Sequence, residues 1–418
     1  MYNKPRLFLV GVLALCTSGI HFAIRSSVAS LIQAEYFDPI DKLRSAEMIG
    51  AVLGVAFLGF AFTVAIGSLL LDIIGMGRLM VLSSLCFIAG TLVVLNAGPA
   101  NYNTVWLGMV IVGVGWGLIE TVINPLTTTL YPEEKTARLN ILHAWWPGGI
   151  ILGGLLSLLL GQFNITWQGR MYMTLIPAAA FGILSLVTKF PPTERAQSGE
   201  PVSTMFQAIA KPMFLVWFGS MFLTAASELA PGQWVDMALT RTVGMQGIWL
   251  LIYVSGLMFV MRHFAGPLAH KLSPVGLLWC SCILAAIGLF GLSVANSPIT
   301  GLAAATAWGT GVCYLWPTML AAAAERFPRG GTLLMGLMAT AGTLSSFFVL
   351  PLLGRVFDEK KVELAGGIDR FNQMTEAARE PLLAAASQLS FRYVAVLPVV
   401  LLFVFGAIWL QERATRKS

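Results

Sequence analysis

Long apolar runs, separated by short polar stretches, dominate this sequence. Four of them, Phe8–Gly19, Val52–Leu71, Val105–Leu118 and Val394–Leu410, contain no charged residue at all. A helix needs about 20 apolar residues to cross the hydrocarbon core of a bilayer, and the polar breaks divide the chain into about twelve such segments. Only 11% of the residues are charged, against about 25% in soluble domains. The sequence therefore predicts an all-α membrane protein with twelve transmembrane helices.

The basic residues between the apolar runs predict an orientation. Cytoplasmic loops are enriched in Lys and Arg, and most basic residues, Arg262 among them, fall in loops that are inside if the N-terminus is inside. The outer side carries fewer, mostly in segment 355–392, and its polar part 357–380 is expected to form a surface helix. We therefore expect an integral protein of the plasma (inner) membrane with both termini in the cytoplasm. The net charge of +6 then reflects topology, and no nucleic-acid partner is expected.

The chain has a polar break near its midpoint. Residues 189–212 are polar and contain four prolines. We interpret this segment as a cytoplasmic linker between an N-terminal six-helix half, residues 1–188, and a C-terminal six-helix half, residues 213–418. Such a division is typical of membrane proteins built from two parallel repeats.

Short sequence repeats support the two halves. A Gly-x-Gly pair followed by an aromatic residue and proline occurs at Gly113–Pro132 and again, with the same spacing, at Gly309–Pro328. The triplet Phe8–Val10 recurs as Phe214–Val216. These repeats make the fourth and tenth helices equivalent, and likewise the first and seventh, so we predict two pseudo-symmetric halves.

A glycine-rich loop follows the second and the eighth apolar runs. The first copy, Gly67–Arg78, places Asp72 before a glycine turn and Arg78, and the second, Gly266–Ser273, has His270 where the first has the acid. Glycine permits a tight turn, and an acid is stabilised beside a helix N-terminus. The pattern resembles the loop signature of the major facilitator superfamily. The resemblance implies the twelve-helix fold of those transporters, with these polar residues in its loop motif.

Four ionisable residues lie inside apolar runs: His21, Arg25, Glu120 and Glu228. A charge in a membrane helix costs several kcal/mol, so it marks a transport pathway or a pairing between helices. His21 and Arg25 are four residues apart and so share a helix face. The structural alternative is a salt bridge, for which Arg25 and Glu120 are the obvious pair.

The residues around Glu120 suit ligand binding. Asn124 follows one turn later on the same face, and Pro125 leaves a backbone carbonyl without its helical hydrogen bond. Asn140 and His143 share a face of the next apolar run. A carboxylate, amides and free carbonyls together suit a cation, a proton or a sugar hydroxyl.

These motifs also resemble one particular family. Glu-x-x-x-Asn-Pro at Glu120–Pro125, then Leu-Asn-x-x-His at Leu139–His143, is similar to the fucose–galactose–glucose proton symporter family, and Ser227–Trp234 is similar to its acidic, glycine-containing seventh helix. The resemblance implies sugar binding together with proton coupling through the acid of the fourth helix. By this resemblance and by position, the substrate-binding residues are Glu120, Asn124, Asn140, His143 and Gln233.

The first helix departs from that family. The family usually carries an acid there for proton coupling, whereas this chain has His21 and Arg25. His21 and Glu228 are therefore proton-coupling candidates beside Glu120. Arg25 also admits an anionic substrate, such as a sugar acid, and is a further substrate-binding candidate.

Trp316 is the aromatic residue best placed to face a substrate. The repeat aligns it with Glu120, and the flat C–H face of a sugar stacks on an aromatic ring, although aromatic residues also gather at membrane interfaces. Glu325 and Arg326, in the loop that follows, are interpreted as part of a gate.

No enzymatic motif is present. The sequence has no nucleophile–base pair, no phosphate-binding loop and no HExxH, and its five cysteines lie in apolar runs without metal-ligand spacing. We therefore expect no enzyme, no cofactor and no bound metal. The prediction is a monomeric secondary transporter of a small polar solute, best a sugar, coupled to protons or alternatively to sodium. An organic-anion or sugar-acid carrier and a non-transporting solute receptor are the other hypotheses.

Overall fold

The computed structural model describes residues 2–192, 202–262 and 272–415, and within these ranges it contains helices and no strand. The long helices of the first half are α1 (Lys4–Ser27), α4 (Ser45–Ile74), α5 (Met76–Leu95), α6 (Tyr102–Leu130), α7 (Lys135–Gln162) and the pair α8 (Trp167–Tyr172) and α9 (Leu175–Leu186). Those of the second half are α12 (Pro212–Val243), α13 (Ile248–Arg262), α15 (Pro274–Leu292), the pair α16 (Pro298–Val312) and α17 (Leu315–Arg326), α18 (Gly331–Ala365) and α20 (Glu376–Thr415).

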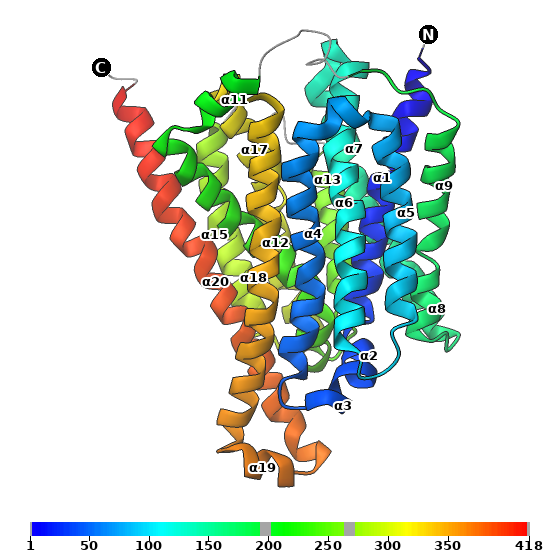
Figure 1. Cartoon of the computed structure of the whole chain (residues 1–418). Coiled ribbons are helices and arrows are strands. Elements are labelled where there is room, and N and C mark those ends of the chain that lie inside the picture. The colour runs from blue at the N-terminus through cyan, green and yellow to red at the C-terminus, as the bar shows by residue number, and fades with distance from the viewer. Residues whose placement is uncertain (1, 193–201, 263–271, 416–418) are drawn as a thin grey trace.

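These helices account for twelve crossings of a membrane. Ten described segments are long and apolar enough to span it, with α8 and α9 counted as one. The short apolar helix α13 and the pair α16–α17 supply the other two. Both termini lie at one end of the bundle (Figure 1), as an even number of crossings requires. We call this end the terminal face and the opposite end the far face. The predicted all-α, twelve-helix fold is confirmed.

Short helices occupy the connections. At the far face α2 (Ala29–Ile32), a π-helical turn (Gln33–Phe37) and α3 (Asp38–Asp41) link α1 to α4. The expected helix in 357–380 is present as the end of α18, α19 (Ile368–Gln373) and the start of α20, which project beyond the other helices (Figure 1). The segment between the halves contains α11 (Val202–Ile209).

Equivalent glycines pack the same way in the two halves. A Cβ atom on Gly113 of α6 would overlap the backbone of Ala56 in α4, the second helix of its half. A Cβ atom on Gly309 of α16 would lie 3.0 Å from a methyl group of Val254 in α13, the second helix of the other half. The repeated glycine therefore faces the second helix of its half in both cases, against backbone in the first half and against a side chain in the second.

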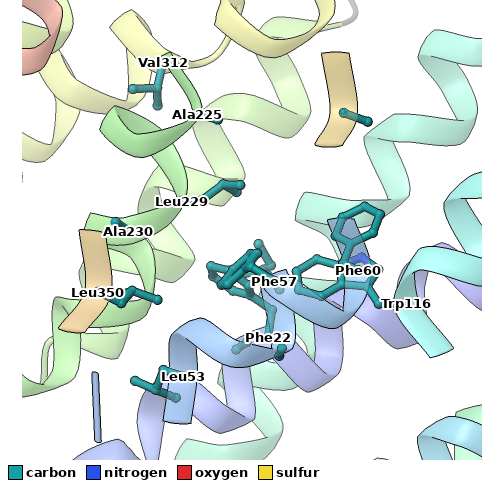
Figure 2. Packing of buried hydrophobic residues seen from close by; sticks show 14 of the residues in the cluster. Phe22, Leu53, Phe57, Phe60, Trp116, Ala225, Leu229, Ala230, Val312 and Leu350 are labelled. Carbon is teal, nitrogen blue, oxygen red and sulfur yellow. The ribbon is translucent and has the colours of Figure 1, made fainter. Parts of the chain in front are cut away.

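The two halves meet along three helix pairs: α4 with α18, α7 with α13, and α1 with α12. Leu53 of α4 and Leu350 of α18 both belong to the continuous apolar core, whose central part is shown in Figure 2. The paired helices leave room for a cavity between the halves.

Candidate functional site

A small cavity of about 60 Å³ lies between the two halves. This volume is below the range of about 300–1,000 Å³ that is usual for small-molecule sites, so the cavity must widen to admit a solute. Four polar side chains line it, Glu120 and His143 from the first half and Glu228 and Arg262 from the second. Glu228 lies halfway along α12. The predicted candidates Glu120, His143 and Glu228 are thus brought together at one place.

A hydrogen-bonded chain joins the polar residues of the first half. Asn124 Nδ2 donates to Glu120 Oε1 at 3.3 Å, and Nε2 of His143 is 2.8 Å from Asn124 Oδ1, which it contacts as a donor when Nε2 is protonated. Asn124 therefore stands behind the cavity and orients both residues that line it. Asn140 belongs to the same helix as His143, but its side chain lies outside the described residues.

The second half supplies a buried ion pair. Arg262 Nη2 is 3.6 Å from Glu228 Oε1, and the two side chains are only 9% and 6% exposed. The other carboxylate oxygen, Oε2 of Glu228, is buried and has no hydrogen-bond partner among the described residues. Since the pair is far from solvent, its charges interact more strongly than they would in water.

Arg262 was assigned to an inner loop from the sequence, and the structure corrects this. It is the last described residue of α13 and points into the cavity. The hydropathy argument missed it because a basic residue at the end of a short apolar run reads as a loop residue. The available signal was its spacing: it lies fourteen residues after Ile248, too few to complete a crossing of about 20 residues.

Prolines explain why Arg262 finds acceptors here. Pro147 in α7 and Pro317 in α17 have no N–H group, so the carbonyls four residues earlier, on His143 and Cys313, lose their helical partners. Arg262 donates from Nη1 to the carbonyl of His143 at 3.5 Å and from Nε to that of Cys313 at 3.3 Å. A continuous series of polar contacts therefore runs from Glu120, through Asn124, His143 and Arg262, to Glu228.

Aromatic side chains form the remaining wall. Trp116, Trp146 and Trp316 line the cavity together with Phe60. The rings of Phe60 and Trp116 are stacked, with centroids 5.1 Å apart and planes 18° apart (Figure 2). The wall offers flat apolar faces opposite the polar groups, and Trp316 lies where the repeat predicts it.

Arg25 lies outside this cavity, on its far-face side. Its side chain is fully buried, its Nε donates to Gln233 Oε1 at 2.9 Å, and Gln233 in turn donates to the carbonyl of Phe22 at 3.1 Å. The hypothesis of an Arg25–Glu120 salt bridge is therefore wrong. The ion pairs described for the chain do not include it, and Arg25 is bonded instead to the side-chain amide of Gln233 in α12.

His21 is also separated from the cavity. It is buried at 3% exposure, with Thr91 Oγ1 3.5 Å from its Nε2 and the ring of Phe87 5.7 Å away edge-on. The candidate proton-coupling histidine thus packs inside the first half. Ser26 meanwhile donates to the carbonyl of Gly232 at 2.9 Å, so α1 and α12 are joined by polar contacts on the far-face side of the cavity.

The loop-motif residues lie at the terminal face. Asp72 and Arg78 line a surface groove between the start of α5 and the end of α9. Glu325 and Arg326, predicted from the sequence to lie in a loop, are the last two residues of α17. Glu325 is exposed, and the guanidinium of Arg326 lies 4.5 Å from the ring centroid of Trp217. His270 lies outside the described residues.

A membrane-embedded helical bundle with a polar cavity between two related halves defines a class of protein, the two-half transporters. The comparisons with known proteins place the chain more narrowly. The family model of the major facilitator superfamily matches residues 7–350. The chain belongs to the major facilitator superfamily and is a transporter in an integral membrane fold.

Several solved structures share this fold. The D-xylose-proton symporter has a TM-score of 0.71 at 15% identity, with 92% of this chain and 96% of that chain covered. A variant of the fucose:proton symporter FucP of E. coli has a TM-score of 0.57 at 15% identity, with 94% and 98% covered. The human organic anion transporter MFSD10 (TETRAN) has a TM-score of 0.66 at 14% identity, with 97% and 100% covered. No curated protein matches the chain by sequence.

Proposed function

We propose that this transporter carries a small polar solute, best a sugar, in symport with protons. The observation that carries the proposal is the lining of the cavity. The carboxylates of Glu120 and Glu228 stand at the two ends of one series of polar contacts, and aromatic rings line the rest of the cavity. Sugar hydroxyls need acceptors such as carboxylates, and the C–H faces of a sugar pack on indole rings. The fold shared with two sugar–proton symporters is in keeping with this choice.

The charges of the cavity favour a neutral solute over an organic anion. Glu120 and Glu228 carry two negative charges when ionised, and Arg262 carries one positive charge that Glu228 already neutralises. Arg25, which would have held an anion, is bonded to Gln233 and does not line the cavity. A sugar acid would therefore meet an unpaired carboxylate, and like charges at close range are unfavourable.

Proton coupling is assigned to the same carboxylates. A buried carboxylate is costly in its charged form unless it is compensated. Glu228 has a compensating cation, whereas Glu120 faces the cavity with only the amide of Asn124 as its described partner. We assign substrate and proton binding to Glu120 and proton coupling to Glu228.

Alternating access would use the two halves as its moving parts. In this proposal the two halves, residues 1–188 and 213–418, rock about the cavity. Residues 189–212 are the linker between them, and the terminal face lies on the cytoplasmic side of the plasma membrane. A monomer suffices because both halves of the cavity come from one chain. A receptor without transport would have the same cavity but would catalyse no flux.

Uptake into proteoliposomes tests the proposal. A panel of neutral sugars and sugar acids is offered with and without an inward-directed proton gradient, and we expect gradient-driven accumulation of a neutral sugar. Glu120→Gln and Glu228→Gln should both remain folded and lose accumulation. Because exchange without a gradient needs no net proton movement, Glu228→Gln should retain exchange.

Two controls separate the alternatives. Gln388→Ala, which removes a part-buried hydrogen bond to the carbonyl of Ala295 at 3.0 Å, far from the cavity, should leave uptake unchanged. Accumulation of sugar acids in preference to neutral sugars would favour the organic-anion hypothesis. Solute binding without any flux would favour the receptor, and normal accumulation by Glu120→Gln would contradict its assigned role.

A further inference from the structure

Arg262 lines the cavity and has partners in both halves, and none of its described contacts is a short ion pair. Its contacts with Glu228, with the carbonyl of Cys313 and with the carbonyl of His143 measure 3.6, 3.3 and 3.5 Å. Charge-assisted hydrogen bonds are usually about 2.7–2.9 Å long. The guanidinium is therefore shared among three acceptors and held at full strength by none of them.

The two carbonyls are available because of prolines in different halves. The carbonyl of His143 is released by Pro147 in α7, and that of Cys313 by Pro317 in α17. A third case shows that released carbonyls are used in this molecule: Pro231 frees the carbonyl of Ser227, which accepts from Trp308 Nε1 at 3.0 Å. A buried carbonyl without a partner is unfavourable, so each such group attracts a donor.

We propose that Arg262 is a positioning residue that ties the two halves together at the cavity through these proline-released carbonyls, and that protonation of Glu228 controls the tie. The inference rests on the proposed proton coupling. It adds a residue on the eighth transmembrane helix that neither the sequence repeats nor the resemblance to known families points to.

The direction of the control follows from electrostatics. When Glu228 is ionised, it attracts the guanidinium within the second half and competes with the carbonyl of His143. When Glu228 is protonated, that attraction is lost, and the guanidinium turns to the acceptors of the first half, the His143 carbonyl and the carboxylate of Glu120. Protonation therefore strengthens the tie between the halves, and deprotonation weakens it.

Other groups face this pair and enter its titration. From the neighbouring helices these are the carboxylate of Glu120, the imidazole of His143, the thiol of Cys313 and the phenol of Tyr314, whose hydroxyl donates to the carbonyl of Met261. The guanidinium of Arg25 lies outside the cavity and is bonded to Gln233.

The test measures the distance between the halves without any substrate. Spin labels are placed at Glu133→Cys and Arg329→Cys in a background without native cysteines. Both positions are exposed and lie in equivalent turns of the two halves at the terminal face. Pulsed electron spin resonance on the full chain in lipid nanodiscs then gives the fractions of short and long distances as a function of pH.

We expect the short-distance fraction of the unsubstituted protein to rise as the pH falls. Glu228→Gln should keep the short-distance fraction at the low-pH level of the unsubstituted protein at every pH, with both distances still populated. Arg262→Gln should reduce the ratio of short to long distances by about tenfold, the effect of one charge-assisted hydrogen bond, and remove the pH dependence. A pH dependence in Arg262→Gln equal to that of the unsubstituted protein would overturn the proposal.

Pro147→Ala tests whether the carbonyl of His143 binds Arg262 because Pro147 leaves it free. The variant should fold well, because alanine is favourable in a helix interior. It gives the carbonyl of His143 a competing helical donor, so the short-distance fraction should fall in the same direction as in Arg262→Gln. No change in Pro147→Ala would contradict the role of the released carbonyl. Arg241→Gln, which removes an arginine from a surface pair with Glu380 at 3.5 Å, is the matched control and should behave like the unsubstituted protein.

Failure of this proposal is distinguishable from failure of the proposed function. Distances that respond to pH through Arg262 support the tie even if the solute is not a sugar. Gradient-driven sugar uptake with distances that ignore Arg262 would support the function and exclude the tie.

Discussion

Buried charges in this molecule are held by neutral dipoles as well as by opposite charges. Arg25 is bonded to the amide of Gln233, and Arg262 reaches two backbone carbonyls as well as Glu228. A hydrogen bond from a charged donor to a neutral acceptor lowers the cost of burial without fixing the charge in one ion pair. Such residues can change partners when the helices move.

The contact between Arg25 and Gln233 predicts an energetic coupling across the halves. In a double-mutant cycle with Arg25→Ala and Gln233→Ala we expect a coupling energy of about 1.5–3 kcal/mol, the usual contribution of a hydrogen bond to a charged group. The free energy of unfolding is measured by denaturation in detergent micelles. The matched cycle with Arg25→Ala and Glu120→Gln should show additivity, since those residues are not in contact. Coupling between Arg25 and Glu120 together with no coupling between Arg25 and Gln233 would instead support a salt bridge between Arg25 and Glu120.

At the scale of helices, close packing between α1 and α7 positions one wall of the cavity. Gly149 and Gly153 of α7 are four residues apart, a small-xxx-small pattern, and they form a close seam with α1. A Cβ atom on Gly149 would overlap the backbone of Cys16, and one on Gly153 would lie 2.6 Å from the carbonyl oxygen of Ile20. This packing keeps His143 and Trp146 of α7 beside the cavity.

Two neighbouring glycines of α7 provide a matched test of this seam. Gly149→Ala would force the backbones of α1 and α7 apart, so we expect a loss of about 1–3 kcal/mol of stability, typical of overpacking. At Gly148 a Cβ atom would meet only side chains at 3.5 Å or more, so Gly148→Ala should be nearly neutral. Thermal unfolding of the purified protein compares the two variants. Equal melting temperatures would show that the helices can separate at little cost.

At the scale of the molecule, hydropathy is enough to predict the fold, because each membrane helix must be apolar along its length. The same cost of burying polar groups singles out Glu120 and Glu228 as cavity residues. It does not predict their partners, because a helix that is apolar all round gives no signal of which face meets which neighbour. The Arg25–Glu120 pairing failed for this reason. Arg262 was missed because hydropathy does not separate a charge at a helix end from a loop charge, and only the short spacing from Ile248 pointed to it.

At the far face a cluster of polar contacts joins α18 to the start of α4 and the turn before it. Glu47 Oε1 is 2.9 Å from Arg355 Nη2, and the backbone N–H of Glu47 donates to Asp358 Oδ2 at 2.9 Å. Lys361 Nζ contacts Asp358 Oδ1 at 2.5 Å and the carbonyl of Lys42 at 3.2 Å. Arg355, Asp358 and Lys361 belong to the second half, and Lys42 and Glu47 to the first, so the cluster must separate before the cavity can open to this side.

Asp358 is the centre of that cluster, and its neutralisation should open the far face. Lys361 is only 3% exposed, and Asp358→Asn would leave its ammonium without an opposite charge while removing an anion from the N-terminus of α4. Breaking a buried pair costs about 3–5 kcal/mol, so the equilibrium should shift strongly toward the state open at the far face. Spin labels at Gln162→Cys and Asn296→Cys, both exposed near that face, should then report longer distances than in the unsubstituted protein. Glu363→Gln removes a carboxylate from an exposed pair with Lys360 in the same helix and should leave the distances unchanged. If Asp358→Asn also leaves them unchanged, the halves are held together at this face by the apolar contacts of α4 and α18 and not by the charged cluster.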